Sequence, residues 1–429
     1  MRGTLPVLAT VALAMAFRAA PASAATNPSG SEGPLTLDQA TELALSHQPA
    51  LVAARAQSRA ARARVGQATA PMLPQVLAAG DFSRVGGSGP GLAKGDSWTA
   101  GVTGTQLLFD FGQAWFGRSA ASASARGQEE TERDTTQLVL LNVRSAWFTA
   151  AAARDLVQVA RETVANREAH LTQIRGFVEV GSRPEIDLVQ ARSDLATARV
   201  LLINQENNLA TSLAQLNQAM GVSGRTDYEL APTAFPPVAG EDGGIEMLVE
   251  EALSHRADLA AIEHEREAQR QTVKSLWASF APALSATGRY GGTGPATSDL
   301  AESWNVGLTL TWPILSGGRT RYQVSEADAT LDALGAQADE IRLQVRLAVE
   351  QGWLSVKAAK AALDATADAV ASAKDRLRLA EARYQAGLGS GLELDDAQVA
   401  ETTAAAQEVQ ARFNLAAARA ELVRALGRS

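Results

Sequence analysis

The second half of this chain repeats the first half. Ala44-Leu45-Ser46-His47 recurs 208 residues later as Ala252-Leu253-Ser254-His255. After a two-residue deletion, an offset of 206 carries residues of the first half onto identical residues of the second: Trp147 onto Trp353, Gly181 onto Gly387, and Gly221 onto Gly427. A register kept over most of the chain indicates a duplicated structural unit. An enzyme usually has one asymmetric active site, so two like halves favour a tube, a channel or a scaffold, and we expect neither catalysis nor a cofactor.

The first 24 residues have the composition of a secretory signal peptide. Arg2 precedes an apolar run over Leu5–Phe17, and Ala22-Ser23-Ala24 forms a small-residue cleavage site. Removing residues 1–24 leaves 37 basic and 47 acidic residues, which is a net charge of −10. This charge disfavours a nucleic acid as partner, and the chain has no cysteine to form disulfides. The sequence therefore predicts an exported, acidic protein.

Each half contains one region that predicts a β-hairpin, at about residues 74–112 and 282–318. The four predicted strands span 74–82, 98–109, 282–290 and 304–315, and a glycine-rich loop joins each pair. From Trp304 to Trp312, apolar side chains at even positions alternate with small or polar side chains at odd positions, which is typical of a strand with one apolar face. Such strands cross an outer membrane, where Trp98, Trp304 and Trp312 would occupy the lipid–water interface. The alternative is an ordinary hairpin with its tryptophans in a soluble core.

The number of strands constrains how such a sheet enters a membrane. Four strands cannot close a barrel, and an open sheet edge is not tolerated in lipid. Bacterial barrels begin at about eight strands. If the hairpins lie in a membrane, the chain must therefore oligomerise, because a dimer supplies eight strands and a trimer supplies twelve.

Most of the remaining chain predicts helix, because it is rich in Ala, Leu, Gln, Glu and Arg. The predicted helices span residues 36–70, 113–180, 185–220, 245–280, 319–385 and 392–426. Glycine-containing breaks at 181–184 and 387–391 predict the tips of two α-hairpins, with Ser182 or Ser390 available to start the next helix. These tips would lie about 100 Å from the β-hairpins at 1.5 Å per residue. The first repeat, the joining loop and the second repeat span 25–221, 222–244 and 245–429.

This arrangement resembles the TolC family of outer-membrane efflux proteins. The most specific features are the duplication, the strand exit Trp312-Pro313-Ile314-Leu315-Ser316-Gly317-Gly318, and the tip from Tyr384-Gln385-Ala386-Gly387 to Asp396. The resemblance implies an α+β membrane protein in which three chains form a twelve-stranded β-barrel, four strands from each chain, continued by a long periplasmic α-helical barrel. It also implies a function: the homotrimer, set in outer-membrane lipid, is the passive exit duct of a tripartite efflux or type I secretion system. Its tips would bind a periplasmic adaptor (membrane fusion) protein, which links it to an inner-membrane pump.

The resemblance also assigns roles to residues at the tips. Asp187, Tyr384, Glu393 and Asp396 fall where well-studied members have the acids and the tyrosine of a periplasmic gate. The loop residues implied to dock the adaptor are Gly181, Ser182, Arg183, Gly387, Leu388, Gly389 and Ser390. Gly389 is a departure, because it stands where those members have an arginine that links neighbouring chains. The alternative for the acids is that they only begin helices and favour the positive end of the helix dipole.

A different class of protein fits part of the pattern. Five leucines repeat every seven residues: Leu188, Leu195, Leu202, Leu209 and Leu216. A heptad of this kind favours a coiled coil. A secreted coiled-coil structural or adhesive protein without a pore is therefore the alternative function.

Overall fold

The computed structural model describes residues 33–86, 95–223 and 228–428. The predicted signal peptide and most of the first glycine-rich loop lie outside these ranges. The helices are α1 (Leu37–His47), α2 (Pro49–Thr69), α3 (Gln113–Glu179), α4 (Glu185–Met220), α5 (Ile245–His255), α6 (Ala257–Ala278), α7 (Arg319–Gln385) and α8 (Gly391–Ala425), with a 3₁₀ turn at η1 (Ala70–Met72). The strands are β1 (Gln75–Val85), β2 (Gly95–Phe109), β3 (Ala283–Gly294) and β4 (Ala301–Thr311).

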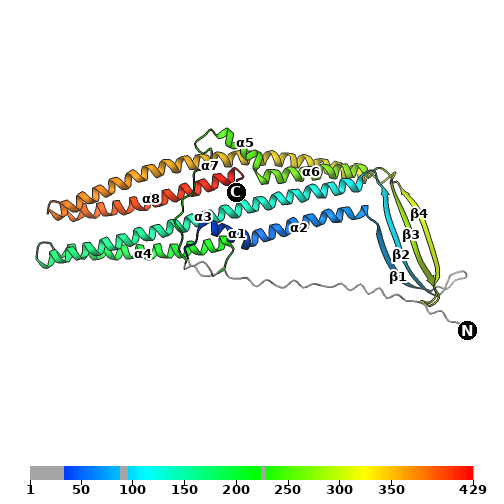
Figure 1. Ribbon diagram of the computed structural model, residues 1–429, viewed down its shortest axis with the longest axis horizontal. Coiled ribbons are helices and arrows are strands. Elements are labelled where there is room, and N and C mark those ends of the chain that lie inside the picture. Colours follow the sequence, from blue (N-terminus) through cyan, green and yellow to red (C-terminus); the bar gives the residue numbers. More distant parts are fainter. Residues whose placement is uncertain (1–32, 87–94, 224–227, 429) are drawn as a thin grey trace.

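The molecule is long and narrow, with the sheet at one end and two helical hairpins at the other (Figure 1). α3 and α7 have 67 residues each, so each extends about 100 Å at 1.5 Å per residue. α4 packs along α3, and α8 packs along α7. Because α7 begins and ends 206 residues after α3, the repeat in the sequence is also a repeat of structure.

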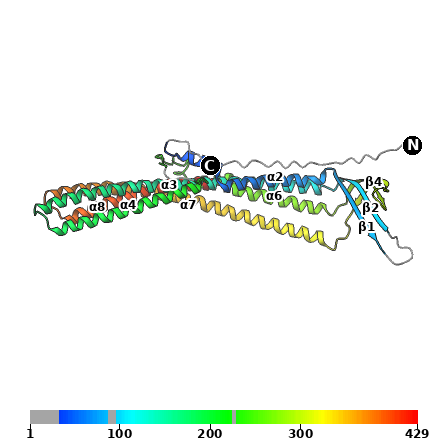
Figure 2. The ribbon, with the colours of Figure 1, turned by 90° about the horizontal axis from the view of Figure 1, so that it is seen from below.

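The four strands form one antiparallel sheet in the order β1-β2-β3-β4, which confirms the prediction of four strands per chain. The pairing of β2 with β3 joins the two repeats, and the strands are tilted against the long helices (Figure 2). β4 ends at Thr311 rather than at Leu315 as predicted. The reason is that Pro313 has no N–H group with which to continue the ladder.

Two segments that were predicted as single helices are each divided in the structure. Residues 36–70 break at Gln48, which is extended because a residue that precedes a proline, here Pro49, disfavours the helical conformation. Residues 245–280 break at the matching place, Arg256. There the Arg256 side chain binds the Asp258 carboxylate in the first turn of α6, with Nε 2.9 Å from Oδ1.

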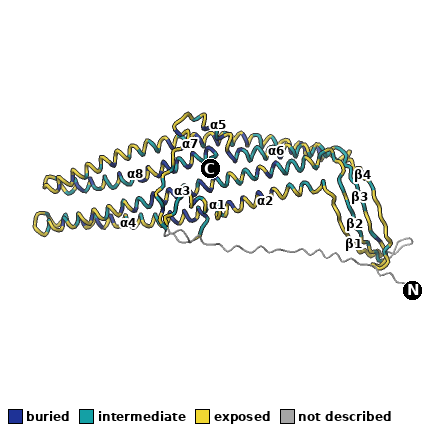
Figure 3. Tube along the Cα trace, in the orientation of Figure 1, coloured by how far each residue is buried: buried dark blue, intermediate teal, exposed yellow. Residues whose placement is uncertain are grey.

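The buried core lies mainly at the middle of the molecule, where α1, α5 and the joining loop pack on the long helices (Figure 3). One cluster of the first repeat surrounds Trp147 and Phe148, and a matching cluster of the second repeat surrounds Val349 and Leu422. A third, smaller cluster lies near the tips and contains Tyr384. None of the helices in the described ranges has a segment long and apolar enough to cross a membrane.

A buried carboxylate ties the joining loop to the second repeat. Glu241 accepts hydrogen bonds from Arg419 of α8 (Oε1 to Nη2, 2.8 Å) and lies 2.7 Å from Nζ of Lys360 on α7. Burial alone would raise the pKa of Glu241, but the hydrogen bonds from these two cations outweigh it and lower the pKa. The loop is therefore held against both long helices of its repeat.

Candidate functional site

The two faces of the sheet differ in chemistry. Residues at even positions share one face through the strand register, and in the middle of the sheet they are apolar or glycine apart from Gln106. A β-bulge between Leu107 and Phe109 turns Phe109 onto the same face, opposite Leu284. On the other face, the charged residues of the described strands are Asp81 and Arg289, and most of the rest are Ser, Thr, Asn or Gly. One face therefore suits lipid, and the other suits water.

The predicted interfacial tryptophans lie at both ends of the apolar face. Trp98 and Trp304 are near the loop end, where the Trp98 ring is 4.6 Å from the Phe82 ring and Trp304 lies opposite Tyr290. Trp312 is at the helix end, and its indole Nε1–H donates to the Phe280 carbonyl at 3.1 Å. The three side chains are 37%, 75% and 59% exposed in this single chain. Their positions fit two aromatic girdles.

Both predicted hairpin tips have the same backbone geometry. Gly181 has a φ of +73° and Gly387 a φ of +74°, a left-handed conformation that favours glycine. Ser390 caps α8, because its Oγ accepts from the Glu393 N–H at 3.1 Å. Ser182 does not cap α4, contrary to the possibility drawn from the sequence: its hydroxyl donates back to the Phe177 carbonyl at 2.9 Å.

The tips also expose apolar side chains. Val180 is 77% exposed and Leu388 is 76% exposed, and the space around Gly181 and Gly387 is open. Gly389 is different, because a Cβ there would meet the Arg383 Cβ at 3.2 Å. A larger residue at position 389 would press on the last turn of α7, so the loop of this chain is built around a glycine.

The structure brings the predicted gate residues to one end but does not join them all. Glu393 pairs with Arg383 across the α7–α8 turn, with Oε1 3.2 Å from Nε. Asp187 and Arg183 are 3.9 Å apart, and the Arg183 guanidinium lies 4.6 Å from the centre of the Tyr384 ring. Within the described part of the chain, the Tyr384 hydroxyl makes no hydrogen bond to Asp187.

The two remaining predicted gate residues, Tyr384 and Asp396, differ in their exposure to solvent. Tyr384 is only 4% exposed, and burial raises the pKa of its hydroxyl, against the opposing effect of Arg183. Asp396 is exposed. Glu393 therefore has a partner in its own chain, whereas Asp396 faces solvent.

One ion pair near the tips was missed in the sequence. Arg167 of α3 lies 2.5 Å from Asp395 of α8, Nη1 to Oδ1. No local pattern identifies this pair, because the two residues are 228 positions apart. They meet only when the two hairpins pack together.

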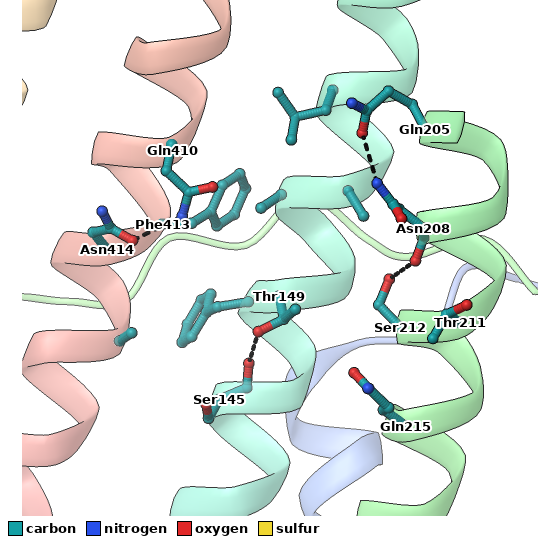
Figure 4. Close-up of a pocket in the computed structure, with 15 residues that line it drawn as sticks. Ser145, Thr149, Gln205, Asn208, Thr211, Ser212, Gln215, Gln410, Phe413 and Asn414 are labelled. Atoms are coloured by element: carbon teal, nitrogen blue, oxygen red, sulfur yellow. Dashed lines mark hydrogen bonds between the residues drawn. The ribbon is translucent and has the colours of Figure 1, made fainter. Parts of the chain in front are cut away.

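An uncharged groove of ≈ 270 Å³, lined by both polar and apolar side chains, lies between α3, α4 and α8. Amides and hydroxyls from the three helices converge on it (Figure 4). Hydrogen bonds along each helix hold them, such as Asn208 to Gln205 on α4 (3.4 Å) and Gln410 to Asn414 on α8 (2.8 Å). A lining without charge gives this surface no preference for cations or anions.

The fold and these surfaces together define a class of protein, an outer-membrane channel with long helices projecting from a membrane sheet. The family described as outer membrane efflux protein matches residues 40–222 and 248–428. Protein CyaE of Bordetella pertussis is 29% identical over 375 residues, which cover 85% of this chain and 78% of CyaE. TolC of Escherichia coli is 24% identical over 400 residues, 88% of this chain and 79% of TolC. A crystal structure of CusC matches with a TM-score of 0.82 and 22% identity, and covers 92% of both chains.

The chain belongs to the outer membrane efflux protein family. This confirms the resemblance to TolC drawn from the sequence, the outer-membrane location and the role as an outer-membrane channel. The family is one of export channels rather than of enzymes.

Proposed function

We propose that three copies of this chain form one channel that carries substrates out of the cell. The observation that carries this proposal is the two-faced sheet, which has an apolar band between aromatic side chains on one face and polar residues on the other. In the described chain, β1 and β4 are the outer strands of the sheet. Lipid does not tolerate such open edges. Three chains joined β4 to β1 close a twelve-stranded barrel and leave no edge.

The helices support the same assembly. Val409 on α8 is buried against α3 of its own chain, whereas its repeat partner on α4, Ile203, is 64% exposed. Phe148 on α3 is likewise buried, and its repeat partner on α7, Leu354, is half exposed. If α7 of one chain packs on α4 of the next as α3 packs on α8, both exposed side chains become covered. The duplicated helices then continue the barrel as an α-helical tunnel.

The tips are the proposed docking surface for a periplasmic adaptor protein. They lie at the end opposite the membrane sheet (Figure 1), and they present exposed apolar residues such as Val180 and Leu388 around two open glycines. The adaptor would connect the tunnel to an inner-membrane pump that supplies the energy. The proposed system is a tripartite efflux or type I secretion system.

The acids at the tips form the proposed gate. Three-fold symmetry turns each inward acid into a ring of three, which concentrates negative potential at a narrow mouth. Because Asp396 has no ion pair within the described chain and Glu393 pairs with Arg383, Asp396 is the stronger contributor to that potential. Arg183 contacts both Asp187 and the Tyr384 ring at the same end of the molecule.

Conductance across a planar lipid bilayer tests this function. Purified protein reconstituted from detergent is expected to give discrete, uniform channel steps that favour cations. A coiled-coil adhesive protein without a pore, the alternative from the sequence, would leave the bilayer insulating and would stay in solution without detergent. An insulating bilayer, or a protein that stays in solution without detergent, would refute the proposed channel.

A further inference from the structure

Aromatic side chains continue the apolar face of the sheet onto the ends of the helices that adjoin it. Phe109 lies on that face, and its ring is 4.8 Å from the ring of Phe111. Trp115, in the first turn of α3, is exposed. Phe280, which follows α6, is also exposed, and its carbonyl accepts from the interfacial Trp312. The apolar surface therefore extends to the place where α3 and α6 meet the sheet.

A groove with two arginines opens next to these aromatic side chains, between α3 and α6. The two helices run side by side as they leave the sheet (Figure 1). The groove has a volume of ≈ 150 Å³, and it is lined by Arg118, Ser119, Ser122, Ala123 and Arg126 of α3 with Glu267 and Gln271 of α6. We call it the arginine groove. Because Ser119 lies one turn after Trp115 on α3, the groove opens on the same side of the helices as the exposed tryptophan.

The two arginines of the groove are not neutralised within the chain. Neither Arg118 nor Arg126 forms an ion pair with any residue that the structure describes. The Arg118 guanidinium lies over the Trp115 ring, 5.8 Å from its centre. The Arg126 guanidinium donates to the hydroxyl of Ser122 at 3.4 Å, one turn nearer the sheet. Both cations therefore keep N–H groups available for an anion.

The groove also contains one acid, Glu267 of α6. Hydrogen bonds from Gln271 (2.6 Å) and from Arg270 lower the pKa of this carboxyl group. The carboxylate is thus ionised, and the charge of Arg270 offsets it. The groove as a whole keeps an excess of positive charge.

The depth of the groove matches the headgroup layer of a bilayer. Arg118 lies about 8 Å along α3 from its first residue, Gln113, at 1.5 Å per residue. A headgroup layer is about 5–8 Å thick, which is half the difference between the whole bilayer and its hydrocarbon core. Side chains on a helix lean toward its N-terminus, and that end of α3 adjoins the sheet (Figure 2). The arginines of α3 therefore lean toward the membrane.

The repeat-equivalent helices carry a different set of charges. The offset of 206 places Asp328 and Asp332 of α7 where α3 has Ser122 and Arg126. The offset of 208 places Arg59 of α2 where α6 has the groove acid. If α7 of one chain packs on α2 of the next as α3 packs on α6, acids and an arginine meet there and balance each other. The fold itself does not require two arginines in the groove.

We propose that the arginine groove binds the phosphate of an anionic phospholipid from the periplasmic leaflet, one lipid in each chain. The two guanidinium groups and the two serine hydroxyls donate to the phosphate oxygens. The acyl chains lie against the aromatic side chains beside the groove. This inference rests on the proposed lipid-facing sheet, and it adds the class of lipid that the junction between sheet and helices selects.

Continuity with the membrane favours a lipid over a free phosphate ion. A free ion gains the hydrogen bonds of the groove alone, whereas a lipid also keeps its apolar contacts with the exposed aromatic side chains. Arginines next to an anionic leaflet gain further from its negative surface potential. A bound lipid would hold the start of α3 at a fixed depth relative to the membrane.

Lipid retention by the complex extracted in detergent tests the site. Native mass spectrometry of the complex titrated with phosphatidylglycerol is expected to show one tightly retained lipid per chain, and weaker retention of the neutral phosphatidylcholine. Arg118→Gln with Arg126→Gln should weaken phosphatidylglycerol binding about thirtyfold, or about fivefold for each arginine, which corresponds to about 1 kcal/mol. The matched control is Arg319→Gln with Arg321→Gln, which removes two arginines from the first turn of α7 outside the groove and should leave the binding unchanged.

A second variant reverses the charge of the groove with residues that the fold already tolerates. Ser122→Asp with Arg126→Asp gives α3 the two acids of α7. This variant is expected to assemble normally and to retain no phosphatidylglycerol. A large excess of inorganic phosphate is expected to leave the lipid bound to the unmodified protein.

The outcomes separate this site from the proposed function. Equal weakening by the groove variant and its control, equal retention of the two lipids, or displacement of the lipid by inorganic phosphate would overturn the site while the channel itself stands. All these variants are expected to keep their channel steps in a planar bilayer. Absence of channel steps from the unmodified protein would instead contradict the proposed function.

Discussion

The sheet and the tips lie at opposite ends of the molecule and are held by different kinds of interaction. Continuous antiparallel ladders hold the sheet, whose apolar face runs across all four strands. The tips have only a small buried cluster around Tyr384, together with ion pairs and capping hydrogen bonds such as Arg383–Glu393 and Ser390 to Glu393. The interactions that hold the sheet cannot be replaced without unfolding it, whereas water can replace many of the interactions that hold the tips.

The difference arises because lipid surrounds one end of the molecule and water surrounds the other. A strand edge or an apolar face in lipid has no other partner available, so the sheet cannot open without a large cost. Ion pairs at a solvated surface contribute little net stability, because water and salt replace them. The chain thus places its fixed interactions at the membrane end and its replaceable ones about 100 Å away.

The largest expected effect is on the sheet. Leu308→Arg places a charge in the middle of the apolar face and should cost about 2–4 kcal/mol in each chain. We expect loss of the assembled protein from the outer-membrane fraction. Thr309→Arg, one residue along on the polar face, is the control and should still assemble. Equal behaviour of the two variants would contradict the two-faced sheet.

The next effect is at the tips. Gly181→Glu and Gly387→Glu put a bulky charge on the proposed docking loop, at a φ where a non-glycine residue costs about 1–2 kcal/mol. We expect export to be abolished while assembly is normal, as measured by substrate accumulation and by membrane fractionation. Gly176→Glu is the control, since Gly176 is exposed within α3 with open space around it. Normal export by assembled tip variants would remove the docking assignment.

A smaller effect is expected from the tip acids. Asp396→Asn should lower the preference of the channel for cations and weaken block by trivalent cations, because it removes a ring of three unpaired charges. Glu393→Gln should do less, because Arg383 already offsets that charge. Ion selectivity from reversal potentials measures both. If the acids only start α8, selectivity stays constant and stability falls by about 0.3–1 kcal/mol.

The smallest effect is expected from Tyr384→Phe. The ring stays packed on Arg183 and in the tip cluster, and only the hydroxyl is lost. Conductance should rise less than about twofold, which corresponds to about 0.4 kcal/mol. A larger rise would mean that the hydroxyl bonds Asp187 in the closed trimer, where one such bond to a charged group is worth about 1.5–3 kcal/mol.

Long periodic elements could be predicted from the sequence because their signals are local. The segment predicted over 319–385 is α7 itself, and the breaks at Gly181 and Gly387 are the two left-handed turns. Alternation of side chains in β4 also located its apolar face. The helix breaks at Gln48 and Arg256 were not predicted. A proline follows Gln48, but none follows Arg256, whose side chain forms an ion pair with Asp258 in the first turn of α6.

Contacts between segments far apart in the sequence could not be predicted, because they depend on how those segments pack together. The pairs Arg167–Asp395 and Arg419–Glu241 join residues more than 170 positions apart. The sequence placed Glu393 and Asp396 together at the start of α8. Only the structure shows that Glu393 pairs with Arg383 and that Asp396 is exposed. The role of Gly389 likewise required the close approach of the Arg383 side chain.

The most direct test of the assembly is the mass of the complex extracted in detergent. Native mass spectrometry of the channel-forming material is expected to show three chains, because twelve strands leave neither β1 nor β4 unpaired. A stable single chain with its sheet inserted, or a complex of two chains, would contradict the account.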